Sequence, residues 1–74
     1  MGHPVASRRY GLYMVYFKSE DEPVLLADAD DLGEAFNWIQ RHYWQMRRHQ
    51  QPQGAFIELL DWESGITIHW TRVG

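Results

Sequence analysis

A single stretch in the middle of the chain has the spacing of an amphipathic helix, and strand-like runs come in pairs on both sides of it. The helix would begin at a capping box, Asp31-Leu32-Gly33-Glu34, in which the Asp31 carboxylate accepts from the backbone N–H of residue 34. The apolar residues that follow fall on one stripe of a helical wheel, and Pro52 and Gly54 come soon after its last turn. The sequence therefore predicts one helix from Asp31 to His49.

Two strand-like runs precede this helix, and two follow it. Tyr10 to Phe17 is continuously apolar or aromatic, and a charged turn containing a proline separates it from the short run Val24 to Ala27. After the helix, Ala55 to Leu60 and Ile66 to Val73 flank a turn that ends in glycine. Each pair is expected to form a hairpin. The predicted fold is α+β with the order ββαββ, a four-stranded antiparallel sheet with the helix packed on one face. This order recurs among small bacterial and phage proteins and assigns no function.

The length of 74 residues allows one hydrophobic core, so the chain is expected to be a single domain, 1–74, with residues 1–8 as a flexible tail. Aromatic residues make up 15% of the chain, and their large buried areas help so small a core to suffice. The expected core combines the helix stripe with residues of the last two strands: Leu32, Phe36, Ile39, Tyr43, Ile57, Leu59, Ile66, Ile68 and Trp70.

The chain has no cysteine, which excludes a disulfide framework, a thiolate metal site and a cysteine nucleophile. Small secreted domains usually need disulfides, so a reducing compartment is favoured, and no window is apolar enough to predict a membrane span. We expect a cytoplasmic protein without membrane contact.

Charge is distributed unevenly along the chain. The net charge is −3, and residues 18–34 hold seven of the ten acidic residues. Proteins that bind nucleic acid through phosphates usually have a net basic surface, so the total argues against this function. A nucleic-acid-binding module nevertheless stays an alternative, with bases stacked on strand aromatics and phosphates held by five arginines. These are Arg8, Arg9, Arg41, Arg47 and Arg48.

Trp44 lies about 100° or more from the predicted core stripe, on the side of the helix that carries Arg41 and Arg48. Exposed tryptophan flanked by arginine is the composition of interface hot spots, and Trp38 extends the patch from the other flank. The sequence predicts a protein-binding surface here. The alternative is a structural cation–π contact between Trp44 and a neighbouring arginine.

The open face of the predicted sheet is the second candidate surface. Period-two alternation in the last strand assigns one set of side chains to the core: Ile66, Ile68 and Trp70. It assigns another set to the open face: Thr67, His69 and Thr71. Together with the aromatics of the first strand, the second set indicates a partner surface, and we expect a homodimer through this face or through the free edge of Val24 to Ala27. The alternative is that loops or the N-terminal segment cover the face.

Catalytic and metal-binding patterns are weak. A second alternative is a small hydrolase or transferase in which His69 and Glu58 on adjacent strands form an acid/base pair, although a cross-strand polar pair is the commoner explanation. His42 and His49 lie about 10.5 Å apart along a helix, too far to share one ion. No metal, no cofactor and no catalytic residue is predicted. The sequence favours a small, non-enzymatic protein-binding or regulatory module that self-associates.

Overall fold

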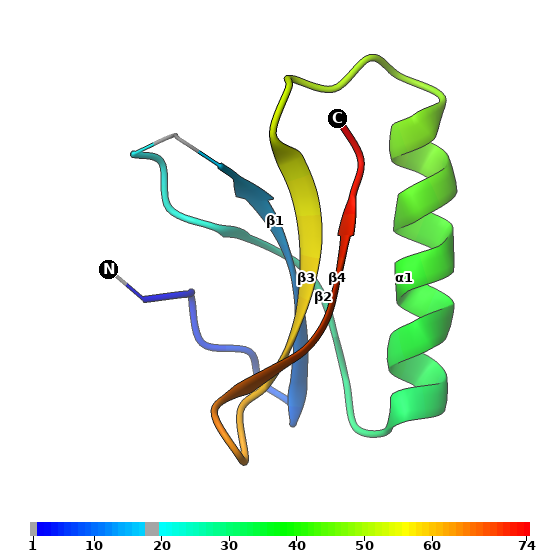
Figure 1. Ribbon diagram of the computed structural model, residues 1–74. Coiled ribbons are helices and arrows are strands. Elements are labelled where there is room, and N and C mark those ends of the chain that lie inside the picture. The colour runs from blue at the N-terminus through cyan, green and yellow to red at the C-terminus, as the bar shows by residue number, and fades with distance from the viewer. Residues whose placement is uncertain (1, 18–19) are drawn as a thin grey trace.

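The computed structural model describes residues 2–17 and 20–74, and it confirms the predicted fold class. The order is ββαββ, as Figure 1 shows. The elements are β1 (Tyr10–Tyr16), β2 (Val24–Ala29), α1 (Leu32–Arg47), β3 (Ala55–Asp61) and β4 (Ile66–Arg72). The predicted turn between β1 and β2 includes Lys18 and Ser19, which lie outside the described residues.

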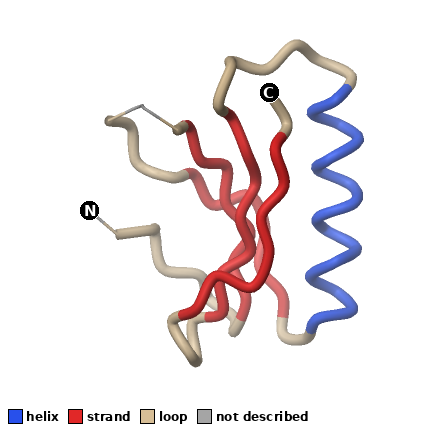
Figure 2. Tube along the Cα trace, in the orientation of Figure 1, coloured by secondary structure: helices blue, strands red, loops and turns tan. Residues whose placement is uncertain are grey.

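The four strands form one antiparallel sheet in the order β2-β1-β3-β4. The two central strands, β1 and β3, pair over their whole lengths, from Tyr10 opposite Asp61 to Tyr16 opposite Ala55. The outer strands are therefore β2 and β4. The helix lies against one face of the sheet, and the N-terminal segment crosses the other face (Figure 2).

The helix begins and ends close to where the sequence predicts. Asp31 is the N-cap, and its Oδ1 accepts from the Glu34 N–H at 2.8 Å. The Glu34 carboxylate accepts from the backbone N–H of Asp30 at 3.4 Å, one residue before the expected partner. Arg48 is the C-cap. The helix is thus one turn or less shorter than predicted, a normal difference at helix ends.

The core lies between α1 and the central strands. The two central strands contribute Tyr10, Leu12, Met14, Ile57 and Leu59 to it. The helix contributes Ile39. The core prediction is right for Ile39, Ile57 and Leu59, and Tyr43 packs against the core while partly exposed. It is wrong for five residues that the structure exposes: Leu32, Phe36, Ile66, Ile68 and Trp70.

This error has a geometric cause. An α-helix is about 10 Å wide and strands lie about 4.8 Å apart, so one helix covers only two or three strands. Here α1 packs on β1, β2 and β3 and has at most marginal contact with β4. Strand β4 consequently gains little cover on its helix side, and of its seven residues only Thr71 is even half-buried.

Each outer strand contains one extra residue relative to its neighbour. Leu26 of β2 has no partner between the pairs Leu12–Ala27 and Tyr13–Leu25. Ile68 of β4 has none between Leu59–His69 and Leu60–Thr67. Such bulges break the alternation of side chains and make a free edge a poorer template for another strand.

Candidate functional site

The face of the sheet opposite the helix is divided into a covered half and an open half. The covered half centres on Tyr13, which is completely buried. Its hydroxyl donates to the Pro4 carbonyl oxygen at 2.5 Å and accepts from the Trp62 indole N–H at 2.8 Å. The Tyr13 ring also lies close over Gly11, where a Cβ would stand 2.7 Å from its nearest ring carbon. Burial raises the pKa of the Tyr13 hydroxyl above its ordinary value of 10.0.

The N-terminal segment covers this half of the sheet. Ala6 is buried, and the His3 ring meets the Tyr13 ring edge-on with centroids 4.7 Å apart. His3 Nε2 also lies 2.6 Å from Glu58 Oε1. The cover that the sequence analysis named as an alternative thus exists over half of the face. The flexibility predicted for residues 1–8 is a property of motion and stays a prediction.

The open half carries an apolar groove of about 610 Å³. Phe17 is 66% exposed and Trp70 62% exposed, and the Phe56 ring meets the Trp70 ring at 5.5 Å in a T-shaped arrangement. The groove brings together the end of β1, the turn before β3, and strands β3 and β4. Its lining residues are Phe17, Gly54, Phe56, Glu58, Thr67, Trp70 and Arg72.

The polar groups of the groove lie at its borders. Glu58 is mostly buried and accepts a hydrogen bond from the Thr67 hydroxyl in addition to its contact with His3. Arg72 is exposed and donates from Nε to the Gly74 carbonyl oxygen at 3.1 Å. A groove with an aromatic lining and few polar groups is suited to hold an apolar side chain.

Strand β4 is exposed on both sides of the sheet. Trp70 faces the groove, because it lies directly opposite Glu58 in the register. Ile66 and Ile68 are exposed as well, and Phe36 of the helix is 43% exposed beside this strand, with its ring 5.9 Å from the His69 ring. Large apolar side chains thus remain in water on both sides of this strand, an arrangement that is typical of interaction surfaces.

The three polar residues predicted for the open face do not share one face. Thr67 is there, at the groove. His69 and Thr71 lie opposite the buried residues Leu59 and Ile57, on the helix side, and hydrogen-bond to each other at 2.8 Å. The expectation of one common face is wrong because the bulge at Ile68 interrupts the alternation.

The acid/base pair considered from the sequence is not assembled. His69 is opposite Leu59, whereas Glu58 is opposite Trp70, so the two side chains lie on opposite faces of the sheet. The contacts of Glu58 are with His3 and Thr67 instead. The geometric basis for a hydrolase or transferase built on this pair is therefore absent.

The structure does bring the predicted helix residues to the surface. Trp44 is 58% exposed, and Arg41 and Arg48 are exposed beside it. Trp38 is half-buried and packs against the core, with the Arg41 guanidinium 5.4 Å from its ring centroid. The predicted cation–π alternative thus exists at Trp38 rather than at Trp44.

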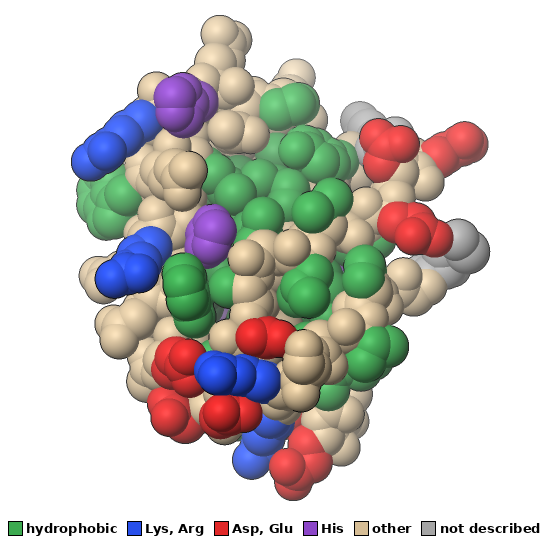
Figure 3. All heavy atoms as spheres, turned by 180° about the vertical axis from the view of Figure 1, so that it is seen from behind, with side chains coloured by type: hydrophobic (Ala, Val, Ile, Leu, Met, Phe, Trp, Pro, Cys, Tyr) green, Lys and Arg blue, Asp and Glu red, His purple; other side chains and the backbone are tan. Residues whose placement is uncertain are grey.

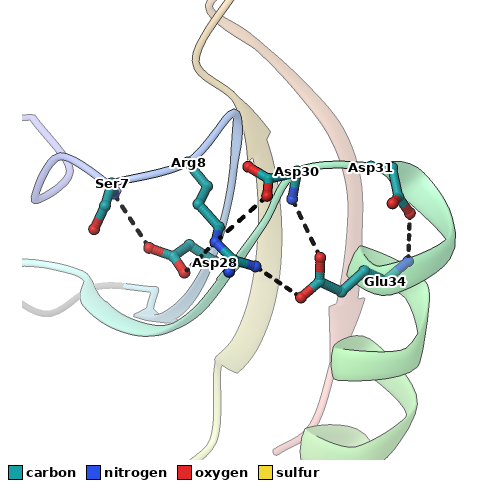
Figure 4. A network of polar contacts seen from close by, with 6 residues as sticks. All are labelled: Ser7, Arg8, Asp28, Asp30, Asp31 and Glu34. Carbon is teal, nitrogen blue, oxygen red and sulfur yellow. Dashed lines mark hydrogen bonds and ion pairs between the residues drawn. The ribbon is translucent and has the colours of Figure 1, made fainter.

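The arginines considered for phosphate binding are not gathered on one surface. Arg8 lies among three carboxylates, those of Asp28, Asp30 and Glu34, and its closest contact is Nη1 to Glu34 Oε2 at 2.8 Å (Figure 4). These carboxylates, Asp30 first, raise the pKa of Arg8. Arg9 pairs with Asp61 through Nε at 3.2 Å. The other three arginines lie on or just after the helix.

Sequence reasoning missed the groove. Phe17, Phe56 and Arg72 were not singled out, and Trp70 was assigned to the core. Two signals point to Phe17 and Phe56: Phe17 ends an aromatic run at a turn, and Phe56 lies two residues before the acidic Glu58, on the same face of a mainly apolar strand. Neither signal places the two residues beside Trp70, because that requires the strand order and the register.

Residues 2–17 and 20–74 contain neither a metal-ligand cluster nor a membrane-spanning helix. Nowhere in these ranges do three or more histidine, cysteine, aspartate or glutamate residues form a group that could hold a metal ion. The one helix in these ranges is neither long enough nor apolar enough to cross a membrane. Comparison with protein-family models, with curated proteins and with solved structures found no match to the chain.

Proposed function

We propose that this protein is a non-enzymatic protein-binding module that self-associates, and that strand β4 with its adjoining groove forms the contact between two copies. The observation that carries the proposal is the exposure of β4 on both sides of the sheet. Burial of apolar surface is the main favourable term in protein association. The exposed rings of Phe17 and Trp70 are the largest such surface beside the groove.

A second copy is the partner that fits this surface. In a two-fold symmetric contact the same patch serves both copies, so an exposed ring and a groove on one patch complement each other. Trp70 of each copy would enter the groove of the other and pack on Phe56 and Phe17. A standard interface takes about 800 Å² from each partner, about a sixth of the 5129 Å² accessible surface of this chain.

The sheet edges support this contact less well than the face. Bulges at Leu26 and Ile68 interrupt both outer strands, and such bulges disfavour the pairing of free edges. The predicted dimer through the edge of Val24 to Ala27 is therefore the weaker version of the proposal.

The absence of cysteine supports a reducing location such as the cytoplasm.

Sedimentation velocity from micromolar to millimolar concentration tests the proposal. We expect the wild type to form a dimer within this range and Trp70→Ala to remain monomeric, because truncation of a central tryptophan typically weakens an interface by about 30-fold or more. Trp44→Ala is the matched control, since Trp44 on the helix is 58% exposed against 62% for Trp70. This control should dimerise like the wild type.

Circular dichroism of the three proteins would establish that each is folded. A wild type that is monomeric at millimolar concentration would refute self-association. A dimer that Trp70→Ala leaves intact and Trp44→Ala dissociates would place the contact on the helix instead of on β4.

A further inference from the structure

Opposite charges are separated along this molecule. Residues 35–57 contain three arginines and two histidines and no acidic residue. They form most of α1 and the connection to β3. Seen from behind, basic and histidine side chains lie on the helix side in its upper part, whereas acidic side chains lie at the lower end, where basic ones are mixed with them, and at the upper right (Figure 3). The C-terminal half of the helix is therefore a positively charged region on a protein whose net charge is −3.

The helix arginines differ from the N-terminal ones in their partners. Arg8 and Arg9 are bound by carboxylates. Among the described residues, Arg41, Arg47 and Arg48 form no ion pair. Arg41 lies over the Trp38 ring, and Arg47 lies over the Tyr43 ring at 5.9 Å. Stacking on an aromatic ring holds a guanidinium in place while its N–H donors stay available.

Trp44 stands in the middle of this region and points away from the core. It is nine residues from the buried Ala35, which at about 100° per residue places the two on opposite sides of the helix. Arg41 precedes it by three residues and Arg48 follows it by four, so the three side chains are neighbours on the outer face. Within residues 2–17 and 20–74, the one ring that Trp44 contacts is that of Tyr43, edge-on at 5.4 Å.

We propose that this outer face of α1, made by Arg41, Trp44 and Arg48, binds an acidic segment of another protein. An apolar side chain of the segment packs on Trp44, and flanking carboxylates pair with the two arginines. The arginines are seven residues apart, about 10.5 Å along the helix. A segment in polyproline II conformation has three residues per turn, so carboxylates three residues apart lie on the same side of it, about 9.3 Å from each other. This surface is separate from the β4 groove and does not depend on self-association.

A short acidic segment fits better than a nucleic acid. The positive region is only about half the length of the helix, and three carboxylates lie at the other end, those of Asp28 in β2, Asp30 before the helix and Glu34 in its first turn. A long polyanion that follows the helix would meet these carboxylates, whereas a peptide of a few residues would not. Affinity for nucleic acid normally requires several phosphate contacts at once.

The test uses nuclear magnetic resonance of the ¹⁵N-labelled full chain at low salt. The probe is a peptide of four Glu-Leu-Ser repeats, which places a carboxylate at every third residue, and the control peptide replaces each Glu by Gln. We expect the acidic peptide to shift the Trp44 indole signal and the amide signals of residues 41–48. The shifts should weaken as salt is raised, because the Debye length falls to about 8 Å at physiological ionic strength.

Two pairs of variants locate the contact. Arg48→Gln should weaken the binding of the acidic peptide by about tenfold, whereas Val5→Glu lowers the net charge by the same one unit at an exposed position in the N-terminal segment and should leave binding unchanged. Trp44→Ala should abolish the shifts, and Trp70→Ala should retain them. In sedimentation the expectation is the reverse: Trp70→Ala prevents dimerisation and Trp44→Ala leaves it intact.

Several outcomes would overturn the proposal. Equal binding of the Gln peptide would remove the role of the carboxylates, and shifts centred on the β4 groove would place the peptide elsewhere. No shift at millimolar peptide would refute an acidic-segment site. Stronger binding of a twelve-nucleotide oligothymidine than of the acidic peptide, on the same helix residues, would assign the surface to nucleic acid.

Discussion

Tyr13 connects the N-terminal segment to the sheet through one hydroxyl group. That hydroxyl contacts the Pro4 carbonyl and the Trp62 indole N–H, while the ring is enclosed between Gly11 and His3. A buried tyrosine whose hydroxyl both donates and accepts a hydrogen bond does more than fill space in the core. Here the hydroxyl fixes the positions of the segments that contain Pro4 and Trp62.

Replacing Tyr13 by phenylalanine should therefore lower the free energy of unfolding by about 1–2 kcal/mol, because the half-buried Trp62 N–H loses its acceptor. Urea denaturation would measure the change. Tyr16→Phe is the control, since the Tyr16 side chain is half-buried and its hydroxyl forms no hydrogen bond to the described part of the chain. Equal stability of Tyr13→Phe and the wild type would show that water replaces the hydroxyl at no cost.

At this scale the sequence could not predict the environment of Tyr13. Tyr10 to Phe17 has no alternation, so either set of side chains can face the helix. The choice depends on contacts with Pro4 and Trp62, and Trp62 is 49 residues away along the chain. Such contacts between distant segments leave no local periodicity to detect.

At the scale of elements, the helix buries a narrower stripe than its apolar residues suggest. Ile39 is 8% exposed and lies in the core, whereas Phe36, one turn earlier, is 43% exposed beside β4. Ile39→Ala should therefore cost about 2–5 kcal/mol, the usual range for a buried aliphatic side chain. Phe36→Ala should cost about 1 kcal/mol, because much of its ring is already in water. Thermal and urea unfolding of both variants would measure the difference, and equal losses would mean that the Phe36 ring is buried in solution.

The helix, the two hairpins and their order could be predicted because each depends on local signals. The N-cap residue Asp31 is such a signal, and its hydrogen bond to the Glu34 N–H forms. Gly54 is another, because the turn before β3 gives it a φ of 89°. The faces of β4 could not be predicted by alternation, since one extra residue at Ile68 changes the side to which the following residues point. Nothing in the amino-acid composition of β4 indicates that bulge.

For the whole molecule, the candidate site arises from a mismatch of widths. One helix is too narrow for four strands, so β4 extends beyond it, and the N-terminal segment covers only the Tyr13 half of the opposite face. The groove beside Trp70 is the part of the opposite face that the N-terminal segment leaves uncovered. The sequence predicts an aromatic surface on the sheet, but the position of this surface depends on which parts of the sheet the helix and the N-terminal segment cover, and that is a property of the assembled fold.

Three groups with shifted pKa values predict how the stability of the whole molecule depends on pH. Burial lowers the pKa of His42 from its ordinary 6.5, so the unfolded chain binds this proton more readily and stability falls as pH drops below 6.5. The hydrogen bond from Arg9 lowers the pKa of Asp61 from 3.8, so its contribution is lost only in stronger acid. Burial raises the pKa of Tyr13 from 10.0, so its contribution is lost as pH rises above 10.

The melting temperature should accordingly be highest between about pH 7 and pH 10 and should begin to fall on the acid side before carboxylates titrate. The first part of that fall, from about pH 7 to pH 5, is assigned to His42, which is half-buried on the helix beside Trp38. His42→Gln should flatten the profile in this interval and leave the steeper loss below about pH 4 in place. Differential scanning calorimetry at micromolar concentration would record both profiles with little contribution from self-association. An unchanged slope between pH 7 and pH 5 in His42→Gln would show that another group controls the acid response, because the substituted side chain cannot take up a proton in either state.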